Sequence, residues 1–95
     1  MAKKLNLIVF RTAREWTTGL IGMKPILGNT VFVFPHVAPG TVFHSRGVLE
    51  PFDLAFVDGR RRVLSARRMT PERDVMIAPA RTVEAWESKA GVLIG

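Results

Sequence analysis

Several residue types on which protein chemistry depends are missing or scarce in this chain of 95 residues. It contains no cysteine, which excludes disulfides, thiolate metal sites and cysteine nucleophiles together. Its two histidines, His36 and His44, fit no zinc-binding spacing, and we expect neither a metal nor a cofactor. No apolar run approaches the ~20 residues of a membrane-spanning helix. The apolar part of the opening segment MAKKLNLIVF is too short for a signal peptide, so we expect a cytoplasmic protein without membrane contact.

Acidic residues are also scarce, and the charge balance is strongly positive. Fourteen lysines and arginines oppose eight acidic residues, which gives a net charge of +6. This excess favours an anionic or acidic partner, with nucleic acid as one candidate. The hydrophobic share of 47% and the charged share of 23% are ordinary for a folded protein, and the length fits a single domain over residues 1–95.

Short apolar stretches divided by turn residues predict a mainly β fold, or β-rich α+β, with one short helix near the N-terminus. Thr12 and Glu15 form a capping-box pattern, and we expect a helix of roughly three turns that ends near Lys24. The dipeptide Asp58-Gly59 is typical of a two-residue hairpin turn. Six to eight short strands would form a compact barrel-like or sandwich-like sheet. The expected strands are residues 5–10, 30–34, 41–46, 53–57, 61–66, 75–77, 82–87 and 92–94.

One acid, Asp53, lies inside a stretch that otherwise has the composition of a buried strand. An ionised carboxylate there is costly unless it is paired or accepts several hydrogen bonds. We favour a structural role, in which Asp53 binds nearby backbone N–H groups or an arginine, either Arg46 or one from the following strand. A ligand contact is the second interpretation. Catalysis is the third, because acid–base chemistry needs a second group and Glu50 need not converge with Asp53.

The segment GRRRVLSARRM is rich in arginine and contains no acid. A hairpin projecting from the domain would present these side chains to a phosphate backbone. The segment has no aromatic residue for base stacking, which argues against recognition of single strands. The charge would equally suit an acidic protein surface or nearby acids such as Asp58 and Asp74. The arginines are Arg60, Arg61, Arg62, Arg67 and Arg68.

Four further segments follow one another in an order and spacing that match a known pattern. They are Gly19-Leu20, Phe32-Val33-Phe34, Phe43 with the block PFDLAFVDG at residues 51–59, and Glu87 with Ala90-Gly91. Through them the chain resembles the bacterial and archaeal domain family DUF192, also called UPF0127, over residues 12–91. The resemblance implies a compact barrel-like β fold with a small helical element and no established enzyme activity.

The chain departs from that family in its central segment. Where the family often has Trp-Met-Lys-Asn-Thr, this chain has HSRGV at residues 44–48, and only the positive charge at Arg46 is kept. The isoleucine that precedes the family's proline is replaced by Glu50. The part of the sequence expected to carry a family site is therefore the part that differs most.

Together these observations predict a small soluble binding or interaction domain without enzyme activity. We expect its contact surface to combine Phe43, His44 and Arg46 with Asp53. His44 and Arg46 would bind an anionic or polar group, and Asp53 would orient Arg46. The first alternative is nucleic-acid binding through the arginines of the basic segment, and the second is a homo-oligomeric structural component encoded by a phage or mobile element. A hydrolase that uses Asp53 or Glu50 is the weakest alternative.

Overall fold

The computed structural model describes residues 4–95, so the first three residues of the segment MAKKLNLIVF lie outside it. Over this range the chain has the predicted mainly β fold, with two sheets and one short helix. None of the helical structure in residues 4–95 is long and apolar enough to cross a membrane. The elements are β1 (Asn6–Val9), α1 (Ala13–Thr18), β2 (Thr30–Pro35), β3 (Val42–His44), β4 (Phe52–Val57), β5 (Val63–Met69), β6 (Val75–Ile77) and β7 (Glu84–Lys89).

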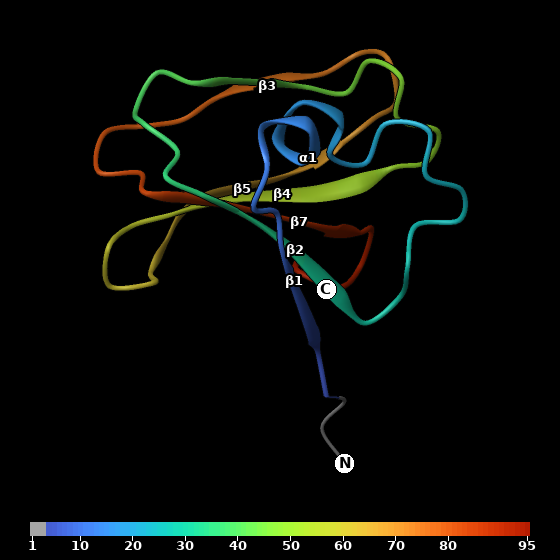
Figure 1. Cartoon of the computed structure of the whole chain (residues 1–95), viewed down its shortest axis with the longest axis horizontal. Coiled ribbons are helices and arrows are strands. Elements are labelled where there is room, and N and C mark those ends of the chain that lie inside the picture. The colour runs from blue at the N-terminus through green and yellow to red at the C-terminus, as the bar shows by residue number, and fades with distance from the viewer. Residues whose placement is uncertain (1–3) are drawn as a thin grey trace.

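The main sheet has five strands in the order β1-β2-β7-β4-β5, and β3 pairs with β6 in a separate antiparallel ribbon. Strand β1 runs parallel to β2, whereas the other neighbours in the main sheet are antiparallel. Strands β1 and β5 are therefore the two edges. In the view of Figure 1, β3 and the main sheet lie on opposite sides of α1.

The hydrophobic core lies on one face of the main sheet, because side chains along a strand alternate between the two faces. Phe52, Leu54 and Phe56 of β4 all belong to this core. From the ribbon, Phe43 packs edge-to-face on Phe34 and on Phe56, with ring centroids 5.3 and 5.4 Å apart. These aromatic contacts hold β3 over the centre of the sheet.

The helix begins as predicted but is shorter than predicted. The capping box is present: the Glu15 N–H donates to the Thr12 hydroxyl at 3.1 Å, and the Thr12 N–H donates to the Glu15 carboxylate at 3.0 Å. The expected end near Lys24 is wrong, because α1 stops at Thr18. The next residue, Gly19, has a φ of 46°, which glycine adopts readily and which does not continue a helix.

The hairpin between β4 and β5 also differs from the prediction. It is not a two-residue turn at Asp58-Gly59, because the residue with left-handed backbone is Arg61, with a φ of 60°. Asp58 closes a longer loop: its carboxylate accepts the backbone N–H groups of Arg60 and Arg62, each at 2.9 Å. An aspartate that binds backbone two residues ahead stabilises such a loop without a glycine at each central position.

Strand ends shift by one to three residues, and one predicted strand is absent. Strand β5 begins later than the expected 61–66, and β7 begins later than the expected 82–87. Residues 92–94 form a turn and an irregular end instead of a strand. The N–H of Val92 donates to the carbonyl of Lys89, whereas the N–H groups of Leu93 and Ile94 donate to the side chains of Ser88 and Asp53 in the main sheet.

Candidate functional site

Asp53 is fully buried on β4 and its carboxylate has three partners. Oδ1 accepts a hydrogen bond from Arg68 Nε, and Oδ2 accepts the N–H groups of Gly91 and Ile94, each at 2.9 Å. Arg68 lies directly opposite Asp53 in the β4–β5 register. The favoured structural role of Asp53 is therefore confirmed, with the arginine supplied by the following strand. The predicted orientation of Arg46 by Asp53 is wrong, because Arg68 and the two N–H groups occupy the carboxylate instead.

The predicted contact surface is only partly assembled. Phe43 and His44 line one cavity, whereas Arg46 and Asp53 do not. His44 is exposed, and its Nδ1 accepts the backbone N–H of Arg46 at 3.1 Å. The Arg46 side chain is exposed beyond the end of β3. The structure thus brings together two of the four predicted residues, and a binding role for them stays a prediction.

Most of the basic segment is neutralised within the domain. Three of its arginines bind carboxylates at 2.9 or 3.0 Å. The pKa of Asp58 is held below its usual value, chiefly because the Arg62 N–H donates to the carboxylate. Arg60 and Arg61 are exposed in the loop, and within residues 4–95 neither forms an ion pair. The pairs are Arg62 with Asp58, Arg67 with Asp74 and Arg68 with Asp53.

Glu50 is half-buried and has its own partners. Its Oε1 accepts the N–H of Ile26 at 3.3 Å and lies 3.9 Å from the Nζ of Lys89. Neither Glu50 nor Asp53 lines the cavity that contains Phe43 and His44. The two carboxylates considered for a hydrolase therefore have structural partners and do not share that hollow.

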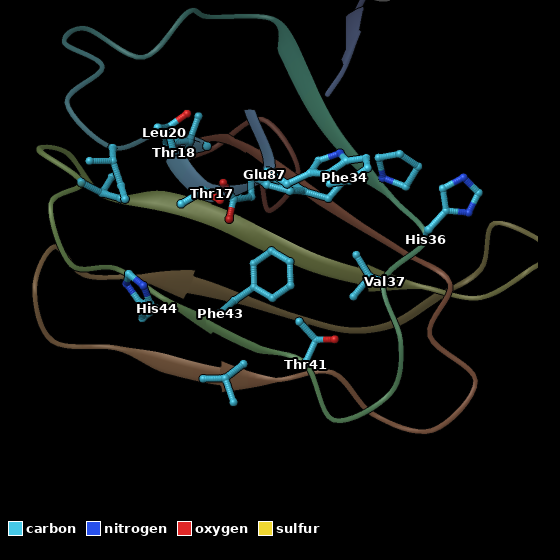
Figure 2. A pocket seen from close by; sticks show the side chains of 16 residues that line it. Thr17, Thr18, Leu20, Phe34, His36, Val37, Thr41, Phe43, His44 and Glu87 are labelled. Atoms are coloured by element: carbon cyan, nitrogen blue, oxygen red, sulfur yellow. The ribbon is translucent and has the colours of Figure 1, made fainter. Parts of the chain in front are cut away.

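A cavity of about 290 Å³ lies between α1, the end of β2, strand β3 and strand β7. Figure 2 shows its wall, to which segments far apart in the sequence contribute. The walls come from residues 16–21, 34–37 and 41–44, together with Val48 and Glu87. Among residues 4–95, no group of three or more histidine and acidic side chains could hold a metal ion.

Glu87 is the one acid in this wall, and only 5% of the residue is exposed. In the sheet its register partners are Phe32 of β2 and Leu54 of β4, both in the core. Within the described part of the chain, no hydrogen bond or ion pair reaches its carboxyl group. Burial therefore acts without compensation and raises the pKa of Glu87 to about 8. At neutral pH this side chain is largely protonated.

Sequence reasoning matched Glu87 to the family resemblance but assigned it no role. The predicted strand ended at residue 87, and no prediction was made about the burial of this acid. One local signal was available, because alternation places Glu87 on the same face as Ala85, which is fully buried. Trp16 and Thr17 were also missed, because their contact with the cavity depends on where α1 stops.

No family model matches this chain, and no curated protein matches it. Two solved structures are similar to it. A protein of unknown function from Novosphingobium aromaticivorans DSM 12444 has a TM-score of 0.80 and 23% sequence identity, over 93% of this chain and 65% of the other. A Sinorhizobium meliloti 1021 protein described as a "putative transcription regulator" has a TM-score of 0.74 and 14% identity, over 94% of this chain and 70% of the other.

At these identities the likeness shows the fold alone. The chain spans 65% of the length of the Novosphingobium structure, so that protein contains further residues without a counterpart here. The resemblance to DUF192 stays a prediction, since neither structure carries that name. What the comparisons establish is a fold that occurs in at least two other proteins, one of which has no known function.

Proposed function

We propose that this chain is a small binding domain whose ligand occupies the cavity around Glu87. The observation that carries the proposal is the carboxyl group of Glu87, a residue that is 95% buried, lines the cavity and has no hydrogen-bond partner within residues 4–95. Residues 4–95 contain no fully buried side-chain oxygen or nitrogen without a partner, so the Glu87 oxygens are open to the cavity. A ligand in the cavity would supply that partner.

The chemistry of the wall supports a small molecule as the ligand. Apolar and aromatic side chains such as Leu20, Phe34 and Val48 make up much of it, with few polar groups. Small-molecule sites are typically concave and mostly apolar, with a few polar groups that fix the orientation of the ligand. The proposal keeps Phe43 and His44 from the predicted surface and replaces Asp53 by Glu87 as the acid.

We propose binding without catalysis. General acid–base catalysis needs a proton donor and a proton acceptor, each within hydrogen-bond reach of the reacting atoms. Glu87 has no hydrogen-bonded side-chain partner within residues 4–95. Asp53 and Glu50 have structural partners away from the cavity.

The proposal is tested by blocking the cavity. Thr17 lies on the exposed side of α1 and lines the hollow, so T17F would place a ring into its mouth. R14F adds the same side chain to the same helix outside the cavity wall and serves as the matched control. A set of small cationic, neutral and anionic fragments is screened by amide chemical-shift changes. We expect the hits to shift residues of the cavity wall and to be lost in T17F but not in R14F. Hits that survive T17F would contradict the proposal.

A second candidate is nucleic-acid binding through the loop between β4 and β5. Two observations favour it. Arg60 and Arg61 are exposed without carboxylate partners in the described chain, and one protein of similar fold is described as a "putative transcription regulator". Because three neighbouring arginines are already paired, the number of phosphate contacts is expected to be small.

Binding of a labelled DNA duplex and a labelled single strand at about 50 and 200 mM salt tests this candidate. Each lost phosphate contact lowers the logarithmic salt slope by about one, so R60A/R61A should lower it by about two. The control is R14A, which removes an exposed arginine from α1. Equal binding by wild type and R60A/R61A would rule out the loop as the site.

A further inference from the structure

No lysine or arginine among residues 4–95 lines the cavity around Glu87. The basic side chains in its wall are the two histidines, His36 and His44. Glu87 stands between Phe32 and Leu54 on the core face of the sheet, where the protein offers its carboxyl no counter-charge. Glu87, Thr17 and Phe43 all line the cavity, and Figure 2 labels all three around it. A positive charge at this point would have to come from the ligand.

The hydroxyl groups of the wall point to the same kind of ligand. Each hydroxyl has one proton to donate and two lone pairs that accept. The hydroxyls of Thr17, Thr18 and Thr41 all donate their proton to backbone carbonyls of their own segment, at 2.9, 3.0 and 2.7 Å. Their remaining capacity is as acceptors. Together with the carboxyl group of Glu87, they form a wall that suits a ligand rich in donors.

Aromatic side chains complete this environment. Trp16, Phe34 and Phe43 line the cavity, and the last two pack edge-to-face at an angle of 87°. The indole N–H of Trp16 already donates to the carbonyl of Phe10 at 2.7 Å, so it is not available to a ligand. The faces of aromatic rings attract cations, and the attraction is strongest where water is excluded.

We propose that the cavity binds a small organic cation, an ammonium group on a short apolar stem, with Glu87 as its counter-ion. This inference rests on the proposed function and names the ligand class for the same site. The ammonium group would donate to Glu87 and to the threonine oxygens, while the stem packs on the aromatic rings. The volume of about 290 Å³ lies near the lower end of the range for small-molecule sites and suits a small ligand.

The proposal predicts a pH dependence with a definite sign. The cation needs the ionised form of Glu87, whereas burial raises the pKa of Glu87 to about 8 in the empty cavity. Binding below that pH must therefore release a proton, and affinity should rise about tenfold per pH unit until about pH 8. The other titratable groups in the wall are His36 and His44, and protonating either adds positive charge. Added positive charge on the histidines would weaken cation binding at low pH, which is the same direction as the effect of protonating Glu87.

Titration calorimetry with n-butylammonium, n-butanol and n-butyrate tests the inference, because these probes share one stem and differ in charge. We expect n-butylammonium to bind more than about tenfold more tightly than n-butanol near pH 8, and to lose about fivefold in affinity between pH 8 and pH 7. In E87Q the preference for the cation and its pH dependence should both disappear, while E50Q, outside the cavity wall, should behave as wild type.

The outcomes separate this inference from the proposed function. If n-butanol or n-butyrate binds as tightly as n-butylammonium, and T17F abolishes that binding, the cavity is a ligand site but the cation is the wrong class. If T17F leaves the binding of every probe unchanged, the cavity is not the site and the proposed function fails. Cation binding that E87Q leaves unchanged would overturn the role of Glu87 as the counter-ion.

Discussion

Asp53 and Glu87 are both buried carboxyl groups on neighbouring strands of one sheet, yet their surroundings are opposite. In the β4–β7 register Asp53 is paired with Ser88, and Glu87 is paired with Leu54. The two acids therefore point to opposite faces of the sheet. Asp53 has three hydrogen-bond donors, whereas Glu87 has none within residues 4–95.

The difference teaches that burial alone does not tell a structural acid from a binding acid. What separates them is the supply of donors. Arg68 and the segment 91–94 cover Asp53 with an arginine and two backbone N–H groups. The face that holds Glu87 is covered by α1 and β3, which bring aromatic rings and hydroxyls whose protons are already used. An acid with partners holds the fold together, and one without them leaves a place for a ligand.

The largest effect expected is the loss of stability in D53N. The substitution removes the charge that binds Arg68 and puts an amide where the carboxylate accepted backbone N–H groups. Arg68 is 47% exposed, so water can solvate the charge that D53N frees, and the loss comes mainly from the two backbone N–H groups left without an acceptor, at about 1–3 kcal/mol each. Denaturant unfolding measures it, with D74N as a control at a less buried aspartate. If D53N and D74N lost the same free energy of unfolding, Asp53 would contribute no more to stability than the less buried Asp74.

E87Q should have the opposite effect on stability, and the size of the gain should depend on pH. The pKa of Glu87 rises from 4.5 to about 8 on folding, so between these values the unfolded state binds fewer protons than the folded state. Wild-type stability should fall by about 1.4 kcal/mol per pH unit in this window, and E87Q should be free of that loss. At pH 7 the gain comes to about 3 kcal/mol, and near pH 4.5 it vanishes.

Unfolding by denaturant at several pH values measures this difference. E50Q is the matched control, because Glu50 has an N–H donor and a lysine beside it. A stability difference between E87Q and wild type that stays constant from pH 5 to pH 8 would show that Glu87 is not buried and unpartnered in solution.

The smallest effects expected are those of single arginine substitutions in β5, and they should be unequal. R68A removes the side chain that is bound to a fully buried carboxylate, and we expect a loss of about 1–3 kcal/mol. R67A removes a partner of Asp74 at the surface, and the loss should be much smaller. Thermal unfolding of the two variants compares them directly. The comparison would fail if R67A were as destabilising as R68A.

Much of the fold could be predicted from local patterns. The alternation of apolar residues and the spacing of turn residues gave the mainly β class, and Thr12 with Glu15 gave the start of α1. The end of α1 could not be predicted in the same way. It depends on a backbone conformation at Gly19 that lets the chain pass close to Phe34, where an added Cβ would lie 3.0 Å from the ring. That approach is a tertiary contact and leaves no local signal.

The candidate site was predictable only in part, for the same reason. Asp53 stood out because an acid in an apolar strand demands partners, and the alternative with an arginine from the next strand was right. The sequence around Glu87 did not indicate that its carboxyl group would lack partners. Its isolation depends on cross-strand neighbours, Phe32 and Leu54, which are 55 and 33 residues away in the sequence. Which faces of α1 and β3 cover it is settled only when the chain has folded.

The hydrogen bonds from residues 91–94 to Asp53 have a consequence for folding during synthesis on the ribosome. Gly91 and Ile94 lie 38 and 41 residues downstream of the carboxylate that they bind. A growing chain can already form the hairpin of β4 and β5, but Asp53 then lacks two of its three donors. Residues 91–94 must leave the ribosome before their N–H groups can bind Asp53. Asp53 therefore acquires its last two donors only after residues 91–94 have been synthesised.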